Sequence, residues 1–70
     1  MERYNYSLLL GRMKERGFTQ DKMAKEVGIS ACSMNLSLNN KRNFRQDEIL
    51  RISALLGITG KDMESYFFAH

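Results

Sequence analysis

The chain has 70 residues and a net charge of +3, with no proline, one cysteine and one histidine. A chain this short makes one domain near the lower size limit for folding without metals or disulfides, so residues 1–70 are predicted to be a single domain. One cysteine excludes an internal disulfide, and a single histidine excludes a histidine-rich metal site. No apolar run approaches the about 20 residues of a membrane span, and no signal peptide is evident, so we expect a cytoplasmic protein that meets no membrane.

The first predicted helix covers residues 6–16, with Asn5 as its cap and Gly17 at its end. Its buried face is indicated by apolar residues at helical spacing, namely Tyr6, Leu9 or Leu10, and Met13. Phe18, just beyond this helix, is expected to enter the core.

Residues 19–42 predict two short helices joined by a tight turn, over 20–27 and 31–39. Thr19 and Ser30 have the hydroxyls needed to cap each helix, and Gly28 can take the left-handed conformation that ends the first one. Met23, Ala24 and Val27 form a buried stripe, and the small Ala24 lets the two helices approach closely. The pattern therefore predicts a helix-turn-helix, although each feature alone also fits a plain helical hairpin.

Two further helices are predicted over 46–56 and 60–67, which completes an all-α domain of five helices without strands. Asp47 and Glu48 lie at the positive end of the 46–56 helix, and Gly57 ends it. The inward residues of both helices are expected to be Ile49, Ile52, Leu55 or Leu56, Met63 and Phe67, with Phe44 anchoring the preceding loop. On the 31–39 helix, Met34 and Leu38 face inward and Leu36 must therefore face outward.

The charge is distributed unevenly along the chain. Residues 1–45 carry nine Lys and Arg against four Asp and Glu, a net +5, whereas residues 46–70 carry two against four, a net −2. The basic half contains the helix-turn-helix, so a basic surface for nucleic acid is expected there. Four cations are expected only to solvate helix faces: Lys14, Arg16, Lys25 and Arg51.

The residues of this segment resemble the helix-turn-helix of the phage repressor and Cro family. The matching positions are Thr19, Gln20, Met23, Ala24, Val27, Gly28, Ile29, Ser30, Met34, Asn39, Lys41 and Arg42. The resemblance extends from the first helix to the closing GITGKDMESYFF, and it is strongest to small Cro-like proteins of phages and prophages of Gram-positive bacteria. It implies a five-helix lambda-repressor-like fold. Asn40 departs from the pattern, because the family usually has glycine there, and asparagine tolerates the left-handed conformation next best.

The resemblance implies a sequence-specific transcriptional regulator that binds double-stranded DNA, with the 31–39 helix in the major groove. The base-facing residues would be Gln20, Ala31, Cys32, Ser33, Asn35 and Leu36. The phosphate-facing residues would be Thr19, Lys22, Asn39, Lys41, Arg42 and Arg45. Which operator is bound, and whether the effect is repression or activation, does not follow from the sequence.

The base-facing positions of the 31–39 helix contain no Arg, Lys or Gln, so the bidentate contacts that discriminate bases are missing except through Asn35. This departure supports an alternative function: an antirepressor that keeps the fold and binds a partner repressor protein, with the outward Leu36 as a contact. A third alternative is another kind of helical adaptor.

No carboxylate pair, nucleophile with a base, metal cluster or phosphate loop indicates an enzyme, a cofactor or a small-molecule substrate. Two readings remain open for the C-terminal Tyr66, Phe67 and Phe68. Phe68 either folds back onto the core or supports a homodimer, since members of the family commonly bind two-fold operators as dimers.

Overall fold

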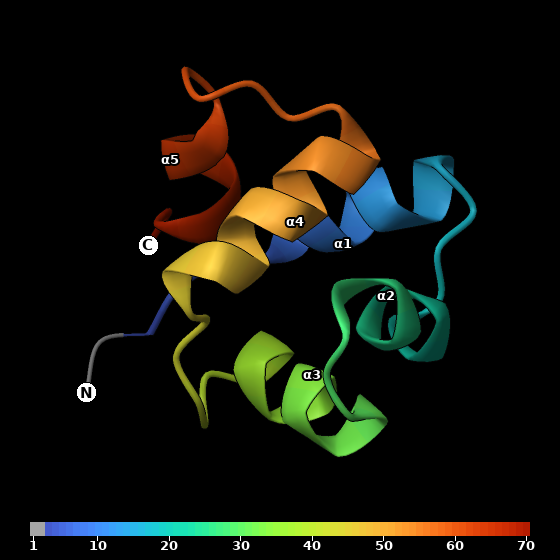
Figure 1. The fold of residues 1–70 in the computed structure, drawn as a ribbon. Coiled ribbons are helices and arrows are strands. Elements are labelled where there is room, and N and C mark those ends of the chain that lie inside the picture. The colour runs from blue at the N-terminus through green and yellow to red at the C-terminus, as the bar shows by residue number, and fades with distance from the viewer. Residues whose placement is uncertain (1–2) are drawn as a thin grey trace.

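The computed structural model describes residues 3–70, which form five helices and no strand, so the all-α, five-helix prediction is confirmed (Figure 1). The helices are α1 (Ser7–Glu15), α2 (Gln20–Val27), α3 (Ala31–Leu38), α4 (Gln46–Leu56) and α5 (Met63–Phe67). Helices α2 and α4 have their predicted bounds, while α1 and α3 are shorter by one residue at one or both ends. Within the described part of the chain, no helix is long and apolar enough to cross a bilayer.

The fifth helix begins at Met63, three residues later than predicted. The backbone N–H of Asp62 donates to the carbonyl of Thr59 at 2.9 Å, and the Thr59 hydroxyl donates to the Asp62 carboxylate at 3.2 Å. This closed turn occupies the segment that the sequence pattern assigned to the first turn of the helix.

The predicted caps of the helix-turn-helix are present. Thr19 Oγ1 accepts a hydrogen bond from the backbone of Lys22 at 3.1 Å, and Ser30 Oγ accepts one from the backbone of Ser33 at 3.0 Å. Gly28 has a φ of 90°, a conformation that glycine adopts without a Cβ clash. Asn5 Oδ1 accepts a hydrogen bond from the Ser7 N–H, the first of α1, at 2.9 Å. The N-cap position itself is occupied by Tyr6, one residue after the predicted cap.

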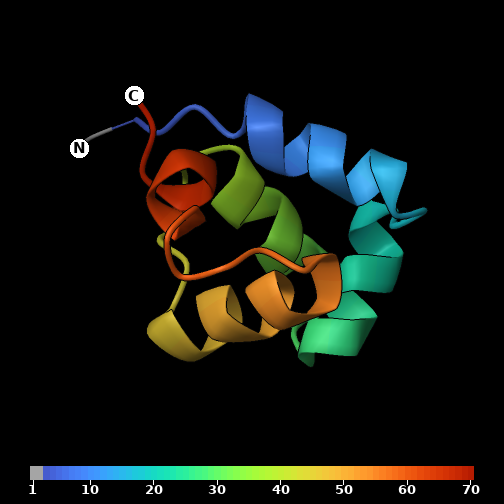
Figure 2. The same ribbon diagram turned by 90° about the horizontal axis from the view of Figure 1, so that it is seen from above.

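Helices α2 and α5 lie at opposite ends of the domain, with α1 and α4 along its two sides and α3 between them (Figure 2). Twelve buried apolar residues from all five helices and their loops form one core: Tyr6, Leu9, Met13, Met23, Ala24, Val27, Met34, Leu38, Ile52, Leu56, Ile58 and Phe67. Leu9 rather than Leu10 is the buried leucine of α1, and Leu56 is more deeply buried than Leu55. The predicted core positions Phe18, Phe44, Ile49 and Met63 are half-buried against it.

Two arginines join α1 and α4 to the ends of other helices. Arg51 Nη1 donates to the Val27 carbonyl at the end of α2 at 2.8 Å, and Arg12 Nε donates to the Leu56 carbonyl at the end of α4 at 3.1 Å. The last carbonyls of a helix lack partners within it and carry partial negative charge, so both contacts are favourable. The prediction that Arg51 merely solvates α4 is therefore wrong.

Asn40 takes the left-handed conformation, with a φ of 61°, as the sequence predicted. Its side chain also pairs with the backbone of Tyr4: the Tyr4 N–H donates to Asn40 Oδ1 at 2.7 Å, and Asn40 Nδ2 donates to the Tyr4 carbonyl at 2.9 Å. Next along the chain, the Asn5 N–H donates to the carbonyl of Ala69. The segment before α1 thus links the loop after α3 to the C-terminal end of the chain.

We predict that Ala24→Leu destabilises the protein by about 1–3 kcal/mol, because Ala24 is 1% exposed where α2 meets α3 and a larger side chain overpacks that contact. Thermal melts followed by circular dichroism measure the effect. Ala54→Leu on the exposed face of α4 is the matched control and should melt like the parent. If both variants matched the parent, the close approach of α2 and α3 would not matter to stability.

Candidate interaction surface

The predicted base-facing residues lie together on the exposed side of the helix-turn-helix. We call the four exposed residues of α3 the α3 face: Ala31, Cys32, Asn35 and Leu36. Leu36 is 36% exposed, so its outward orientation is confirmed, and Ser33 is half-buried. Gln20 of α2 reaches this face, since Asn35 Nδ2 donates to Gln20 Oε1 at 3.3 Å. The two amides that could recognise an adenine are paired with each other across the turn.

The predicted phosphate-facing residues are in part engaged within the protein. Thr19 caps α2, and Asn39 Nδ2 donates to the Asn35 carbonyl at 2.8 Å. Lys22 Nζ lies 5.3 Å from the centre of the Phe18 ring, a cation–π distance. Lys41 is exposed.

Arg45 completes the phosphate-facing set around the loop after α3. Its side chain is 74% exposed, with Nε 3.8 Å from the Asp47 carboxylate. An ion pair this exposed is worth little, so it holds the guanidinium only weakly. Lys22, Lys41 and Arg45 are thus the cations of the set that remain at the surface.

Arg42 is positioned quite differently from a phosphate contact. Its two terminal nitrogens donate to both carboxylate oxygens of Glu48 at 2.9 and 2.8 Å, and Nη1 also donates to Ser37 Oγ at 2.8 Å. The Glu48 side chain is only 4% exposed and that of Arg42 26%. A bidentate pair of this kind is short, directional and mostly withdrawn from water, so this guanidinium is committed to its partners within the protein.

The hydrogen bonds from Arg42 lower the pKa of the Glu48 carboxyl below its ordinary value, and a further bond from the backbone N–H of Arg45 at 2.9 Å acts in the same direction. Burial alone would raise this pKa, so the Arg42 contact outweighs desolvation. The same contact raises the pKa of Arg42. The pair therefore stays ionised and joins the end of α3, the following loop and the start of α4.

Sequence reasoning missed the structural role of Ser37 and Glu48. From the sequence, Glu48 was interpreted only as a charge at the positive end of α4, and Ser37 was assigned no role. Both are buried: Glu48 is 3% exposed and Ser37 0%. A glutamate three residues after the N-cap of a helix is a signal for capping, but nothing local in the sequence shows that an arginine six residues earlier will cover it.

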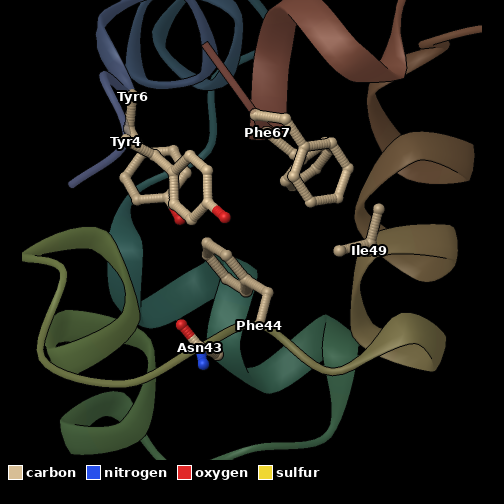
Figure 3. A pocket seen from close by; sticks show the side chains of 7 residues that line it. Tyr4, Tyr6, Asn43, Phe44, Ile49 and Phe67 are labelled. Carbon is tan, nitrogen blue, oxygen red and sulfur yellow. The ribbon is translucent and has the colours of Figure 1, made fainter. Parts of the chain in front are cut away.

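The C-terminal aromatic residues take three different positions. Phe67 is buried, Tyr66 half-buried and Phe68 45% exposed, as their succession around a short helix requires. Phe44 packs edge-on against Tyr6 at 5.5 Å and against Phe67 at 5.7 Å between ring centres. Figure 3 shows these rings around a small cavity of about 70 Å³ that Tyr4, Asn43 and Ile49 also line.

Among residues 3–70, no three His, Cys, Asp or Glu side chains gather where they could hold a metal ion. Cys32 is exposed on the α3 face. The arrangement offers hydrogen-bonding amides, an exposed leucine and scattered cations, which is the chemistry of a binding surface.

A protein-family model described as "Protein of unknown function (DUF739)" matches residues 2–70. The chain belongs to this family. None of the curated proteins matches it.

Among solved structures, the chain is similar to the solution structure of the modulator of repression (MOR) of the temperate bacteriophage TP901-1 from Lactococcus lactis. The two share 38% sequence identity with a TM-score of 0.79, over 93% of this chain and 88% of that one. The resemblance to small phage regulators is thereby confirmed, and the protein that this chain resembles is a regulator rather than an enzyme. Membership of the phage repressor and Cro family in the narrower sense stays a prediction.

We predict that Glu48→Gln lowers the stability at pH 7 by about 2 kcal/mol, because it leaves Arg42, which is mostly withdrawn from water, without its counter-charge. The pKa of Glu48 is lowered in the folded protein, so the ion pair stabilises the fold above the ordinary carboxyl pKa of 4.5. That stabilisation disappears as the pH falls through the lowered value.

Thermal melts from pH 7 into the acid range measure this dependence. The parent should converge on the variant as the pH falls. Asp47→Asn, at an exposed carboxylate on the same helix, is the control and should follow the parent throughout. A constant gap between Glu48→Gln and the parent at all pH values would contradict the assignment.

Proposed function

We propose that this protein is a modulator of repression that acts by binding a partner repressor protein through the α3 face. The observation that carries this proposal is the similarity, at 38% identity over 93% of the chain, to a phage modulator of repression. Because the similarity extends over nearly all of both chains, it supports a common role in a phage regulatory circuit. In that role, the target of this chain would be a repressor protein.

The chemistry of the α3 face supports a protein partner over an operator. None of its four residues carries a charge, and Asn35 is engaged with Gln20. Specific operator binding relies on Arg, Lys, Gln or Asn contacts to base edges, each worth about 1–3 kcal/mol of discrimination. An exposed leucine flanked by alanine and cysteine instead offers an apolar centre with a small rim, as protein interfaces do.

The electrostatics point the same way. Arg42, the central cation of the predicted phosphate-facing set, is held by Glu48 and Ser37. A repressor partner would meet a surface that is less basic than the sequence suggests, so its own DNA-binding cations would be repelled less. The second candidate, a Cro-like operator binder, is favoured by the exposed Lys22, Lys41 and Arg45 beside the helix-turn-helix.

We predict that Leu36→Asp weakens the binding of the repressor encoded beside this gene by about 30-fold or more, because it places a charge at the centre of the interface. Isothermal titration calorimetry with the purified parent and variant measures it. Leu8→Asp, at a leucine of α1 that is 57% exposed, is the control and should bind like the parent. If the parent failed to bind the repressor, the proposed function would be wrong.

The operator alternative is tested with two duplexes, one from the DNA flanking the gene and one of scrambled sequence. We expect similar, weak and salt-dependent affinity for both, since the exposed cations supply attraction without base discrimination. Replacing Lys41 and Arg45 by alanine should weaken both equally and flatten the salt dependence by about one unit of slope for each phosphate that the variant no longer binds. Arg42 is left intact because its removal would disturb the fold.

Fluorescence anisotropy at several salt concentrations measures both affinities. A preference of about 1,000-fold or more for the flanking duplex is typical of operator binding. Found together with no repressor binding, it would establish the Cro-like function in place of the one proposed.

A further inference from the structure

The turn of the helix-turn-helix brings two side-chain amides together at the edge of the α3 face. Helices α2 and α3 lie side by side (Figure 1), and Asn35 Nδ2 on α3 donates to Oε1 of Gln20, the first residue of α2, at 3.3 Å. The two positions are 15 residues apart in the chain, and both are exposed. We call Gln20 and Asn35 the amide pair. It borders the exposed Leu36, which follows Asn35 on the same helix.

The amide pair keeps most of its hydrogen-bonding capacity for a partner. A side-chain amide has two N–H donors and an oxygen that accepts two hydrogen bonds. Among residues 3–70, neither side chain makes a hydrogen bond other than the one that joins them, so this bond uses one N–H of Asn35 and one lone pair of Gln20. Both N–H groups of Gln20 and the oxygen of Asn35 are left for a partner.

These groups matter once a partner covers the α3 face. A protein that packs on Leu36 also withdraws the neighbouring amide pair from water. A polar group withdrawn from water without a hydrogen bond weakens binding, so a partner that leaves these groups unmatched is rejected. The bond between the two amides satisfies one donor and one acceptor in advance, which reduces what the partner must supply.

The free groups select the chemistry of the partner. A neutral amide has both an acceptor for Gln20 and a donor for Asn35, whereas a carboxylate only accepts, and an ammonium or guanidinium group only donates. The α3 face carries no charge, and the next residues of α2, Asp21 and Lys22, have charges of opposite sign. The local charge therefore gives an ionic group no advantage over a neutral amide.

The spacing of the free groups favours a protein over a base of DNA. An asparagine or glutamine that recognises adenine uses the donor and the acceptor of one amide. Here the free donors of Gln20 and the free acceptor of Asn35 belong to two joined residues. A protein main chain presents carbonyl and N–H groups from successive residues, and a side-chain amide is free to turn, so either can reach both positions.

We propose that the amide pair determines the specificity of the α3 face by binding a neutral amide of the repressor, from its main chain or from an Asn or Gln side chain. Gln20 Nε2 donates to the carbonyl oxygen of that group, and an N–H of the group donates to Asn35 Oδ1. Because the two amides are joined, removal of either one disturbs the contact of the other. This inference rests on the proposed function and adds the chemistry that the repressor must present.

The first test is a double-mutant cycle with the repressor encoded beside this gene, measured by isothermal titration calorimetry. We expect Gln20→Ala and Asn35→Ala each to weaken binding by about fivefold or more. The double variant should bind about as weakly as the weaker single variant, because two residues that act as one unit do not have additive effects. Gln46→Ala removes another exposed glutamine that begins a helix, so it is the matched control and should bind like the parent.

Charged substitutions at Gln20 test whether the partner group is neutral. Gln20→Glu still accepts from Asn35 but loses the outward donor, and Gln20→Lys only donates. We expect each to bind the repressor about fivefold or more weakly than the parent. Gln46→Glu and Gln46→Lys carry the same charges on α4 and correct for general electrostatic attraction. After that correction, tighter binding by Gln20→Glu would indicate a cation and tighter binding by Gln20→Lys a carboxylate, and either would overturn the neutral amide.

The remaining outcomes separate this inference from the function on which it rests. A parent that binds the repressor, with both alanine variants within about twofold of it or with losses that multiply in the double variant, would overturn the inference alone. A parent that does not bind the repressor would overturn both. A preference for the flanking duplex that either alanine variant abolishes would assign the amide pair to base recognition and overturn the inference. The substituted positions are exposed, so each variant should keep the circular dichroism spectrum of the parent.

Discussion

The ion pair of Arg42 with Glu48 is the contact on which the arrangement of the helix-turn-helix relative to the rest of the domain depends. It is bidentate, with distances of 2.9 and 2.8 Å, and it joins the loop after α3 to the first turn of α4. A carboxylate this buried must be paired, and the hydroxyl of Ser37 at the end of α3 completes the network. The loop is thereby fixed where it passes from the helix-turn-helix to the remaining helices.

The same ion pair changes how the positive charge of the chain is interpreted. Three arginines act inside the protein: Arg42 on Glu48, Arg12 on the carbonyl end of α4 and Arg51 on that of α2. Each contact uses a guanidinium to satisfy acceptors that the fold leaves without partners. Arg42 and Arg12 belong to residues 1–45, so the net +5 of that segment overstates the charge that faces outward, in keeping with the protein partner that we propose for the α3 face.

The C-terminal aromatic residues show how burial of one side chain exposes another. Phe67 fills the core beside Phe44, and its place on a helix of five residues directs Phe68 outward. The exposed Phe68 and the half-buried Met63 then form one wall of an apolar groove that Leu50 and Ile49 of α4 complete. The apolar groove outside the helix-turn-helix is thus a consequence of how α5 packs.

The sequence by itself determined the five helices, the caps at Thr19 and Ser30 and the left-handed residues Gly28 and Asn40, because these depend on residues within one or two turns. It also determined that Leu36 faces outward, since helical spacing fixes which side of α3 is buried. Only the tertiary structure decided that Arg42 pairs with Glu48 rather than facing solvent, that Asn40 pairs with Tyr4, and that a groove lies between α4 and α5. The pairing of Asn40 with Tyr4 joins positions 36 residues apart, and the groove joins separate helices. Such contacts depend on how the core brings elements together, which no local pattern specifies.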